Sequence, residues 1–184
     1  MARSTGIWPS EGLHGALVEN DMMIREIPQS EFRPFFQLMG EIECGTHFDP
    51  SKPEHVEWLK EIISRRYGSG ARFYALHEND EPVAVAGIVT EKVLCTKWSR
   101  AELTDIGVFA QHRRKGYGTK LLRFVEDQAR DAGCWGLHLL TYAADPDAIS
   151  FYLRNGYAVV GAVADTCGPD DEGDVWLRKV LAER

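Results

Sequence analysis

Long apolar runs are absent from this sequence of 184 residues, and that absence excludes a class of protein. No stretch approaches the roughly 20 apolar residues that a membrane-spanning helix needs. The N-terminus also lacks a basic segment followed by an apolar one, as a secretory signal would have. We therefore expect no membrane partner and a cytoplasmic protein.

Cysteines are few, and their spacing excludes the usual cysteine frameworks. Cys44, Cys95, Cys134 and Cys167 lie far apart and form no C-x-x-C pair. This spacing predicts reduced intracellular thiols rather than disulfides or a zinc site. The six histidines show no H-E-x-x-H or other paired spacing, so the sequence predicts no metal site.

Positive charge is also in short supply. The chain has 21 Lys and Arg against 28 Asp and Glu, a net charge of −7. Non-specific nucleic-acid binding depends on a basic face, so we expect no nucleic-acid partner. The acidic balance suits a cationic amine substrate, although solubility alone also explains it. With 44% hydrophobic residues, the chain can bury one core but is short for two domains.

A basic turn with two glycines stands between a predicted strand and a predicted helix. Residues 113–118 read Arg-Arg-Lys-Gly-Tyr-Gly, after an apolar stretch and before a helical pattern. A helix start offers unpaired N–H groups and partial positive charge to an anion. Gly116 and Gly118 allow close backbone approach, and arginine suits phosphate contact. We expect a pyrophosphate here, the alternative being a solvated charge run before a surface helix.

The turn matches neither common nucleotide-binding motif. No G-x-x-x-x-G-K-[S/T] loop occurs, and neither Gly107 nor Gly116 begins a G-x-G-x-x-G fingerprint. The pattern [R/Q]-x-x-G-x-[G/A], with a V-x-x-x-x-R lead-in from Val108 to Arg113, resembles motif A of the GNAT superfamily of N-acetyltransferases. That resemblance implies acetyl-CoA as co-substrate. The cofactor-binding residues it implies here are Ile106, Gly107, Val108, Arg113, Arg114, Lys115, Gly116, Tyr117, Gly118 and Thr119.

A second segment resembles motif B of the same family. The run from Asp145 to Tyr157 matches N-x-x-A-x-x-x-Y-x-x-x-G-[F/Y], except that Asp145 replaces the usual Asn. Asp145 suits a helix N-cap, Pro146 the first helical position, and Gly156 the left-handed position after the helix. A carboxylate cannot donate the hydrogen bond that an amide could. Cofactor contact by Asp145 therefore stays open.

The order of expected elements agrees with this resemblance. We expect strands at residues 22–26, 72–77, 82–89, 101–109, 137–141, 157–163 and 174–180, and helices at 31–43, 54–66, 119–132 and 145–155. Ser30 and Ser51 are the expected N-terminal caps of the first two helices. The resemblance implies a single-domain α/β (α+β) fold at residues 22–184, with a mixed, splayed sheet of about six to seven strands and helices on both faces. Residues 1–21 are expected to be a loosely ordered extension or a docking strap.

Acetyl transfer to an amine needs a group that takes a proton from the attacking ammonium. The resemblance implies Glu102, because members of the histone-acetylating branch have a glutamate base at this strand position. An exposed charge at the strand end is the alternative. Strand alternation predicts one face with Glu102, Thr104, Ile106 and Val108, and the opposite face with Asp105.

Tyr152 is the expected proton donor to the departing thiolate. Motif B implies this role, and a phenol with a pKa of about 10 stays protonated at neutral pH. Tyr152 and Ala148 should share one side of their helix, with Ile149 and Leu153 as the packing pair. The alternative is a tyrosine that only packs. The resemblance also implies that a backbone N–H near Val108 holds the acyl oxygen, with Gly107 as a flexible point.

The acceptor amine is less well defined. Residues 165–174 contain five carboxylates and no basic residue. This loop attracts a polyamine, an aminoglycoside or a lysine-bearing peptide, or is simply a solvated hairpin tip. Asp165 and Glu172 in it are further candidates for the base. Five aromatic residues either line an acceptor pocket or belong to the core: Trp58, Tyr67, Phe73, Trp98 and Trp176.

Two functions from different classes stay open. In the first, the protein acetylates a primary amine of a small molecule or peptide by direct attack in a ternary complex with acetyl-CoA. In the second, it is a catalytically silent CoA-binding regulatory module of the same fold. The basic turn and Tyr152 favour the enzyme, whereas Asp145 favours the silent module. A homodimer is compatible with either.

Overall fold

The computed structural model describes residues 17–19, 22–44, 47–94, 96–166, 168–169 and 172–182. The strands are β1 (Leu17–Glu19), β2 (Met22–Ile27), β3 (Arg72–Glu78), β4 (Glu81–Lys92), β5 (Ser99–Val108), β6 (Cys134–Tyr142), β7 (Ala158–Val163) and β8 (Asp174–Val180). The α-helices are α1 (Phe36–Cys44), α2 (Pro53–Gly68), α3 (Tyr117–Asp131) and α4 (Pro146–Arg154), and the 3-10 helices are η1 (Gln29–Glu31), η2 (Arg33–Phe35) and η4 (Ala110–His112).

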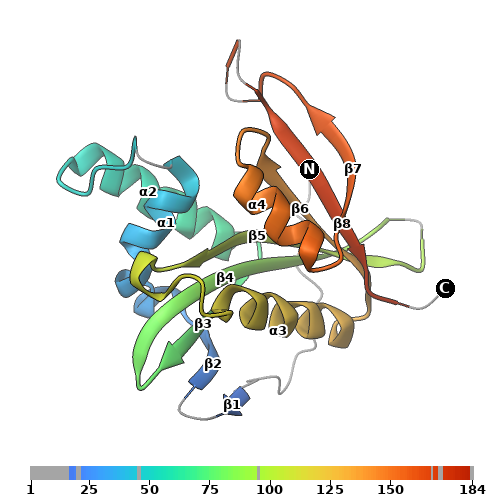
Figure 1. Cartoon of the computed structure of the whole chain (residues 1–184), viewed down its shortest axis with the longest axis horizontal. Coiled ribbons are helices and arrows are strands. Elements are labelled where there is room, and N and C mark those ends of the chain that lie inside the picture. The colour runs from blue at the N-terminus through green and yellow to red at the C-terminus, as the bar shows by residue number, and fades with distance from the viewer. Residues whose placement is uncertain are drawn as a thin grey trace.

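Within these residues the eight strands form one mixed sheet in the order β1-β2-β3-β4-β5-β6-β8-β7. Helices α1 and α2 cover one face, and α3 and α4 lie against the other (Figure 1). The predicted mixed sheet with helices on both faces is therefore confirmed, and the three-residue β1 is its eighth strand.

No described helix is long and apolar enough to cross a membrane. Of residues 1–21, only 17–19 are described, and they pair with β2.

The first two helices begin differently from the prediction. Pro34 interrupts the segment expected to be helical from residue 31, because proline lacks an N–H and disfavours helical geometry in the residue before it. Two 3-10 turns fill that stretch, and α1 starts only at Phe36. Ser51 does not cap α2 either. Its N–H and hydroxyl both donate to Asp49 Oδ1, at 2.9 and 2.7 Å, and Lys52 is the N-cap.

Two apolar cores hold the helices to the sheet. On one side, Leu122, Val125 and Ala129 of α3 are buried against the sheet, because their spacing puts them on one face of the helix. On the other side, α1 and α2 bury Leu38 and Leu59 against the opposite face of the sheet. Burial of one such leucine contributes about 1.5–3 kcal/mol. The central strands are thus fixed from both faces.

Strands β5 and β6 pair only at their beginnings. Their parallel ladder contains Ser99↔Cys134, Ala101↔Leu137 and Glu102↔His138, although β5 continues to Val108 and β6 to Tyr142. Beyond Glu102 the two strands therefore diverge. The edge of β5 that faces β6 has no strand partner there among the described residues. This divergence confirms the predicted splay.

A β-bulge in β5 changes which residues share a face. Gly87 of β4 pairs with Asp105 and Ile88 pairs with Leu103, so Thr104 is an extra residue. The bulge shifts the alternation by one position. As a result Ala101, Leu103, Ile106 and Val108 face α3, whereas Glu102, Asp105 and Gly107 face α1 and α2. The predicted grouping of Glu102 with Ile106 and Val108 was wrong.

The close contact opposite the bulge gives a test of this geometry. A Cβ added at Gly87 would lie 2.6 Å from the Phe73 ring, 2.6 Å from Thr104 Oγ1 and 2.9 Å from Asp105 Oδ2. We expect Gly87→Ala to lower the free energy of unfolding by about 1–3 kcal/mol, because a buried ring cannot move freely. Chemical denaturation measures the change. Gly68→Ala, at the end of α2 with no neighbour within 4 Å, is the matched control. Equal stability of the two variants would contradict the bulge.

Candidate functional site

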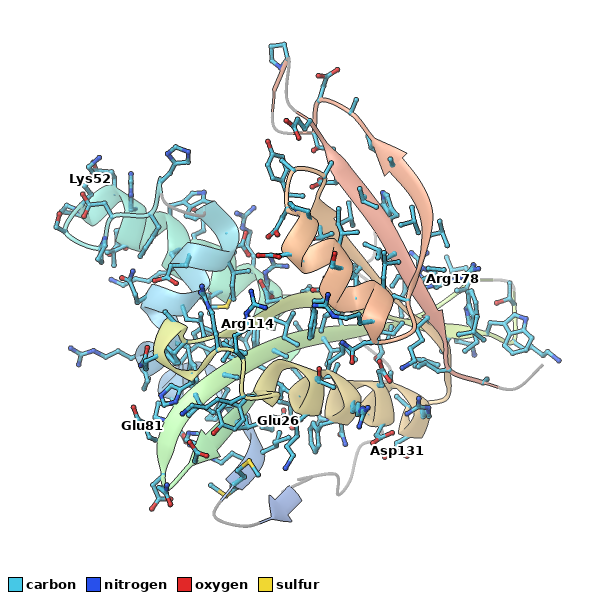
Figure 2. The ribbon with its side chains drawn as sticks, in the orientation of Figure 1. Glu26, Lys52, Glu81, Arg114, Asp131 and Arg178 are labelled. Carbon is cyan, nitrogen blue, oxygen red and sulfur yellow. The ribbon has the colours of Figure 1, made fainter. Side chains whose placement is uncertain are left out.

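The basic turn adopts the geometry expected of an anion site. Gly116 has φ of +84° and is the N-cap of α3, and a Cβ added there would meet nothing within 4 Å. Arg114 also has positive φ, +64°, which is unusual for a residue with a side chain. Figure 2 shows Arg114 beside the start of α3. The N-terminus of this 15-residue helix therefore points its free N–H groups at the turn.

A cavity of about 500 Å³ adjoins this turn. We call it the turn cavity, and its walls are Val108, His112, Arg113, Arg114, Gly116, Tyr117, Gly118, Thr119, Asp145, Asp147, Phe151 and Arg154. Most of the predicted cofactor residues thus lie around one space. Lys115 is not in the wall, and its ammonium lies 5.9 Å from the ring centre of Tyr117. The sequence prediction missed Asp147, Phe151 and Arg154, which only the docking of α4 brings to this cavity.

Two side-chain contacts hold the turn against the β3–β4 hairpin. Tyr117 donates its hydroxyl hydrogen to the carboxylate of Glu78, the last residue of β3. His112 Nε2 lies 3.4 Å from Glu81 Oε1, at the start of β4. On the other side, Arg113 Nε donates to the Val108 carbonyl at 3.0 Å. These contacts hold the turn in place before any ligand binds.

Asp145 fulfils its predicted structural role. Its Oδ1 accepts a hydrogen bond of 2.9 Å from Ala148 N, so it caps α4. Gly156 follows the helix with φ of +87°, as predicted. Asp145 also lines the turn cavity, together with Asp147. Two carboxylates thus face the same space as Arg113, Arg114 and Arg154.

A second cavity, of about 320 Å³, continues from the turn into the gap beside β5. We call it the gap cavity, and its walls are Leu38, Glu41, Ile42, Ile106, Gly107, Val108, Arg113, Gly118, Ala148, Phe151 and Tyr152. It shares Val108, Arg113, Gly118 and Phe151 with the turn cavity. A Cβ at Gly118 would touch Phe151 and Val108 at 3.5 Å, so glycine keeps this junction wide. The two cavities form one path from the turn to Tyr152.

Tyr152 lies at the inner end of this path and is buried. Its ring packs edge-on against Phe151 and Tyr157, at centroid distances of 5.2 and 5.6 Å. Burial first, then the charges of Asp105 and Asp145, raise the pKa of Tyr152. Tyr152 and Ala148 share the cavity-facing side of α4, as predicted. The predicted packing pair was wrong, because Leu153 is 48% exposed while Phe151 and Tyr152 pack.

Gly107 serves close packing. A Cβ there would lie 2.6 Å from Ile42 Cδ1 and 3.1 Å from Leu38 Cδ1, both on α1. The missing side chain lets α1 approach the end of β5, which brings Leu38 and Ile42 into the wall of the gap cavity. This contact with α1 is the structural reason for glycine at the position that the sequence analysis treated as a flexible point.

Glu102 and Asp105 face the same side of the sheet but differ in environment. Glu102 is exposed, whereas Asp105 is buried. Asp105 Oδ1 lies 3.2 Å from the Arg66 guanidinium, which also binds the carboxylate of Glu43. Burial raises the pKa of Asp105 to about 7, although Arg66 opposes the shift. The prediction that Asp105 faces away from Glu102 was wrong, because the bulge at Thr104 puts both on the side of α1 and α2.

The aromatic candidates for acceptor binding include both buried and exposed residues, and part of the acidic loop is not described. Phe73 is fully buried, and Tyr67 packs against the same core and donates its hydroxyl hydrogen to the Ile27 carbonyl at 2.8 Å. Trp58 and Trp98 are 39% and 47% exposed. In the acidic loop, Asp170 and Asp171 lie outside the described residues, so its steering role stays a prediction. No cluster of metal-ligating side chains occurs in the described part of the chain.

Comparison with known proteins gives consistent matches. A family model described as "Acetyltransferase (GNAT) family" matches residues 24–157. Probable N-acetyltransferase 14 of Xenopus tropicalis is 40% identical over 105 residues, which are 56% of this chain and 48% of that protein. The chain spans less than half the length of the curated relatives it matches.

Two solved structures share the fold. The ribosomal-protein-S18-alanine N-acetyltransferase from Escherichia coli superposes with a TM-score of 0.67 at 19% identity, covering 89% of this chain and 96% of that one. The PaiA N-acetyltransferase from Thermoplasma acidophilum, in complex with coenzyme A, gives a TM-score of 0.62 at 19% identity, covering 86% and 98%. At this identity the likeness concerns the fold alone.

The buried Asp105 makes stability depend on pH in a defined direction. Its pKa rises from an ordinary 3.8 to about 7 on folding, so the folded chain binds the proton more tightly than the unfolded chain. Asp105 therefore costs stability as pH rises from about 4 to about 7. Between pH 5 and pH 8, we expect the free energy of unfolding of Asp105→Asn to rise by at least about 1 kcal/mol relative to that of the wild type.

Denaturant unfolding at several pH values measures this difference. Asp131→Asn, at an exposed carboxylate near the end of α3, is the matched control, since it leaves Asp105 intact. A pH dependence of Asp105→Asn identical to that of wild type would contradict the assignment.

Proposed function

Because the chain belongs to the acetyltransferase (GNAT) family, we propose that it transfers the acetyl group of acetyl-CoA to a primary amine. The amine attacks directly within a ternary complex. One observation carries this proposal: the turn cavity and the gap cavity form a continuous path that ends at Tyr152. The path has the basic turn and the start of α3 at one end and Tyr152 at the other.

The turn cavity suits the pyrophosphate of CoA. The N–H groups at the start of α3 and the guanidinium groups of Arg113, Arg114 and Arg154 would hold the anion. Asp145 and Asp147 oppose part of this attraction, and Asp145 is already engaged in capping α4. The coenzyme A complex of the structurally similar Thermoplasma acidophilum protein supports this choice of ligand.

The gap cavity suits the pantetheine arm and the thioester. Its walls are apolar at Leu38, Ile42 and Ile106, so they would exclude water from the reacting carbonyl. The edge of β5 beyond Glu102 has no strand partner in the described residues, and buried backbone groups need partners. A ligand lying along this edge would supply them. A backbone N–H near Val108 would then stabilise the negative charge on the acyl oxygen.

Glu102 is the proposed base. It faces α1 and α2, is exposed, and lies where β5 and β6 begin to diverge. It would take the proton from the attacking ammonium, directly or through water, and release it to solvent. Asp105 is buried against Arg66 and cannot exchange protons with solvent as readily. We assign Asp105 to positioning Arg66 and the bulge.

Tyr152 is the proposed hydrogen-bond donor to the departing thiolate. Its raised pKa keeps the phenol protonated over the working pH range. A thiol has an ordinary pKa of about 8.5, so complete transfer of the phenol proton would be uphill. The hydroxyl therefore acts by donating a hydrogen bond to the sulfur as its negative charge develops, and the thiolate is then protonated from solvent.

The catalytically silent alternative has one feature in its favour. Asp145 and Asp147 place two carboxylates in the cavity that would hold the pyrophosphate. A silent module would bind acetyl-CoA but would not release free CoA thiol in the presence of any amine. An assay of thiol release across a panel of primary amines separates the two functions.

The junction of the two cavities provides the binding test. Gly118→Asp adds bulk and negative charge where Phe151 and Val108 lie only 3.5 Å from a Cβ. We expect the affinity for acetyl-CoA to fall at least tenfold, or about 1.4 kcal/mol, because like charges repel. Isothermal titration measures the affinity, and circular dichroism checks the fold. Gly68→Asp, far from the turn, is the control, and unchanged affinity in Gly118→Asp would refute the cofactor site.

Substitution of Glu102 and of Tyr152 should have different kinetic effects. Glu102→Gln should depress kcat/KM most at low pH, where most of the amine is protonated and needs a base.

Tyr152→Phe should lower kcat about 10²-fold while acetyl-CoA affinity stays within twofold, since only a hydrogen-bond donor is lost. Glu61→Gln on the exposed side of α2 is a control. A pH-independent effect of Glu102→Gln would indicate a structural role for Glu102.

A further inference from the structure

A third cavity lies at the opposite end of β5 from the basic turn and has a volume of about 680 Å³. We call it the tryptophan cavity, and its walls are Val93, Thr96, Lys97, Trp98, Arg100, Trp135, His138, Val180 and Ala182. None of these residues lines the path proposed for acetyl-CoA.

Strand pairing places the tryptophan cavity on the same face as Glu102. His138 of β6 is the ladder partner of Glu102, and Arg178 of β8 is the ladder partner of His138. Paired residues on neighbouring strands project from the same face, and strands lie about 4.8 Å apart. Arg100 precedes Glu102 by two residues, so it shares that face at a distance of about 7 Å. The cavity therefore begins next to the proposed base.

Cations gather around this cavity. Lys97 and Arg100 are in its wall, and the Lys97 ammonium lies 4.9 Å from the ring centre of Trp98. Arg178 is not in the wall, but its guanidinium lies 5.3 Å from the ring centre of the wall residue Trp135. Arg100 adds a third positive charge, although it pairs with Glu91 at 2.8 Å. Figure 2 shows Arg178 on β8, close to the end of the β4–β5 hairpin. These charges contrast with the net charge of −7 of the whole chain.

His138 adds a polar group that lacks a partner. Its Nε2 is buried and makes no hydrogen bond to any described residue. Burial lowers the pKa of His138, and Arg100 and Arg178 lower it further. His138 lines the cavity, so a ligand there would contact the ring of this neutral imidazole. Buried polar groups without a partner are rare and call for one.

We propose that the tryptophan cavity binds the acceptor, and that the acceptor is an aromatic carboxylic acid with a primary amine at the opposite end of the ring. This inference rests on the proposed acetyltransferase function and names the substrate class of that site. The ring packs against Trp98 and Trp135, and the carboxylate binds Arg100 beside His138. Arg178, next to Trp135, adds positive charge and holds that ring in place. The amine then points to Glu102 and the gap beside β5.

The dimensions and charges favour this class over other amines. One benzene ring with substituents at opposite ends spans roughly the 7 Å between Arg100 and Glu102 along the strand. Polyamines and aminoglycosides carry several positive charges, and Lys97, Arg100 and Arg178 would repel them. A flexible aliphatic acid could not stack on the aromatic walls and would lose more conformational entropy on binding. The cavity therefore selects both a ring and an anion.

Binding without reaction tests the cavity separately from the enzyme activity. The probe is 4-methylbenzoate, which has the ring and the carboxylate but no amine, titrated calorimetrically into the full-length chain. We expect saturable binding that weakens at least tenfold in Arg178→Gln and in Trp135→Leu. Arg123→Gln, at an exposed arginine on α3 on the other face, should bind like wild type. Undetectable binding, or equal binding in Arg178→Gln, would overturn the proposal.

Turnover tests the selectivity. We expect 4-(aminomethyl)benzoate to exceed benzylamine at least tenfold in kcat/KM, and Arg178→Gln to abolish that advantage. A preference for benzylamine or spermidine over the aromatic acid would overturn the acceptor class. If 4-methylbenzoate binds as expected but no amine releases CoA thiol, the acetyltransferase proposal fails while the anion site stands.

Discussion

The divergence of β5 from β6 is the constraint on which the rest of the site depends. Their ladder stops at Glu102↔His138, and two residues later Thr104 is added to β5 as a bulge. The divergence frees one edge of β5 and opens the gap beside it. The bulge then turns Ile106 and Val108 toward α3 and Asp105 toward α2. Without the bulge, the residues after Thr104 would face the opposite sides of the sheet.

The sign of the charged side chains changes along β5. At its C-terminal end, arginines and the start of α3 surround the turn cavity. In the middle, the buried Asp105 is balanced by Arg66 from α2. At its N-terminal end, Arg100 and Arg178 lie near the tryptophan cavity. Two groups of positively charged side chains thus lie at opposite ends of one strand, and a buried carboxylate lies between them.

Much of the site was predictable because its signals are local. The glycine turn, the N-cap at Asp145 and the glycine after α4 depend on residues adjacent in sequence. The bulge at Thr104 was not predictable, since alternation describes a regular strand and contains no information on register. The pair Arg66–Asp105 joins elements far apart in sequence. Strand β8 lies between β6 and β7, and this order brings Arg178 beside His138. Only tertiary packing decides such neighbours.

Arg113 connects the turn to α1. Its guanidinium donates to the Val108 carbonyl at 3.0 Å and lies 3.6 Å from Glu41 of α1. An anion at the turn competes with Glu41 for this one cation, and α1 also supplies Leu38 and Ile42 to the gap cavity. Occupancy of the turn thus alters the restraint on α1. By thermodynamic linkage, any ligand whose affinity depends on the position of α1 would change the affinity of the turn for an anion by the same factor.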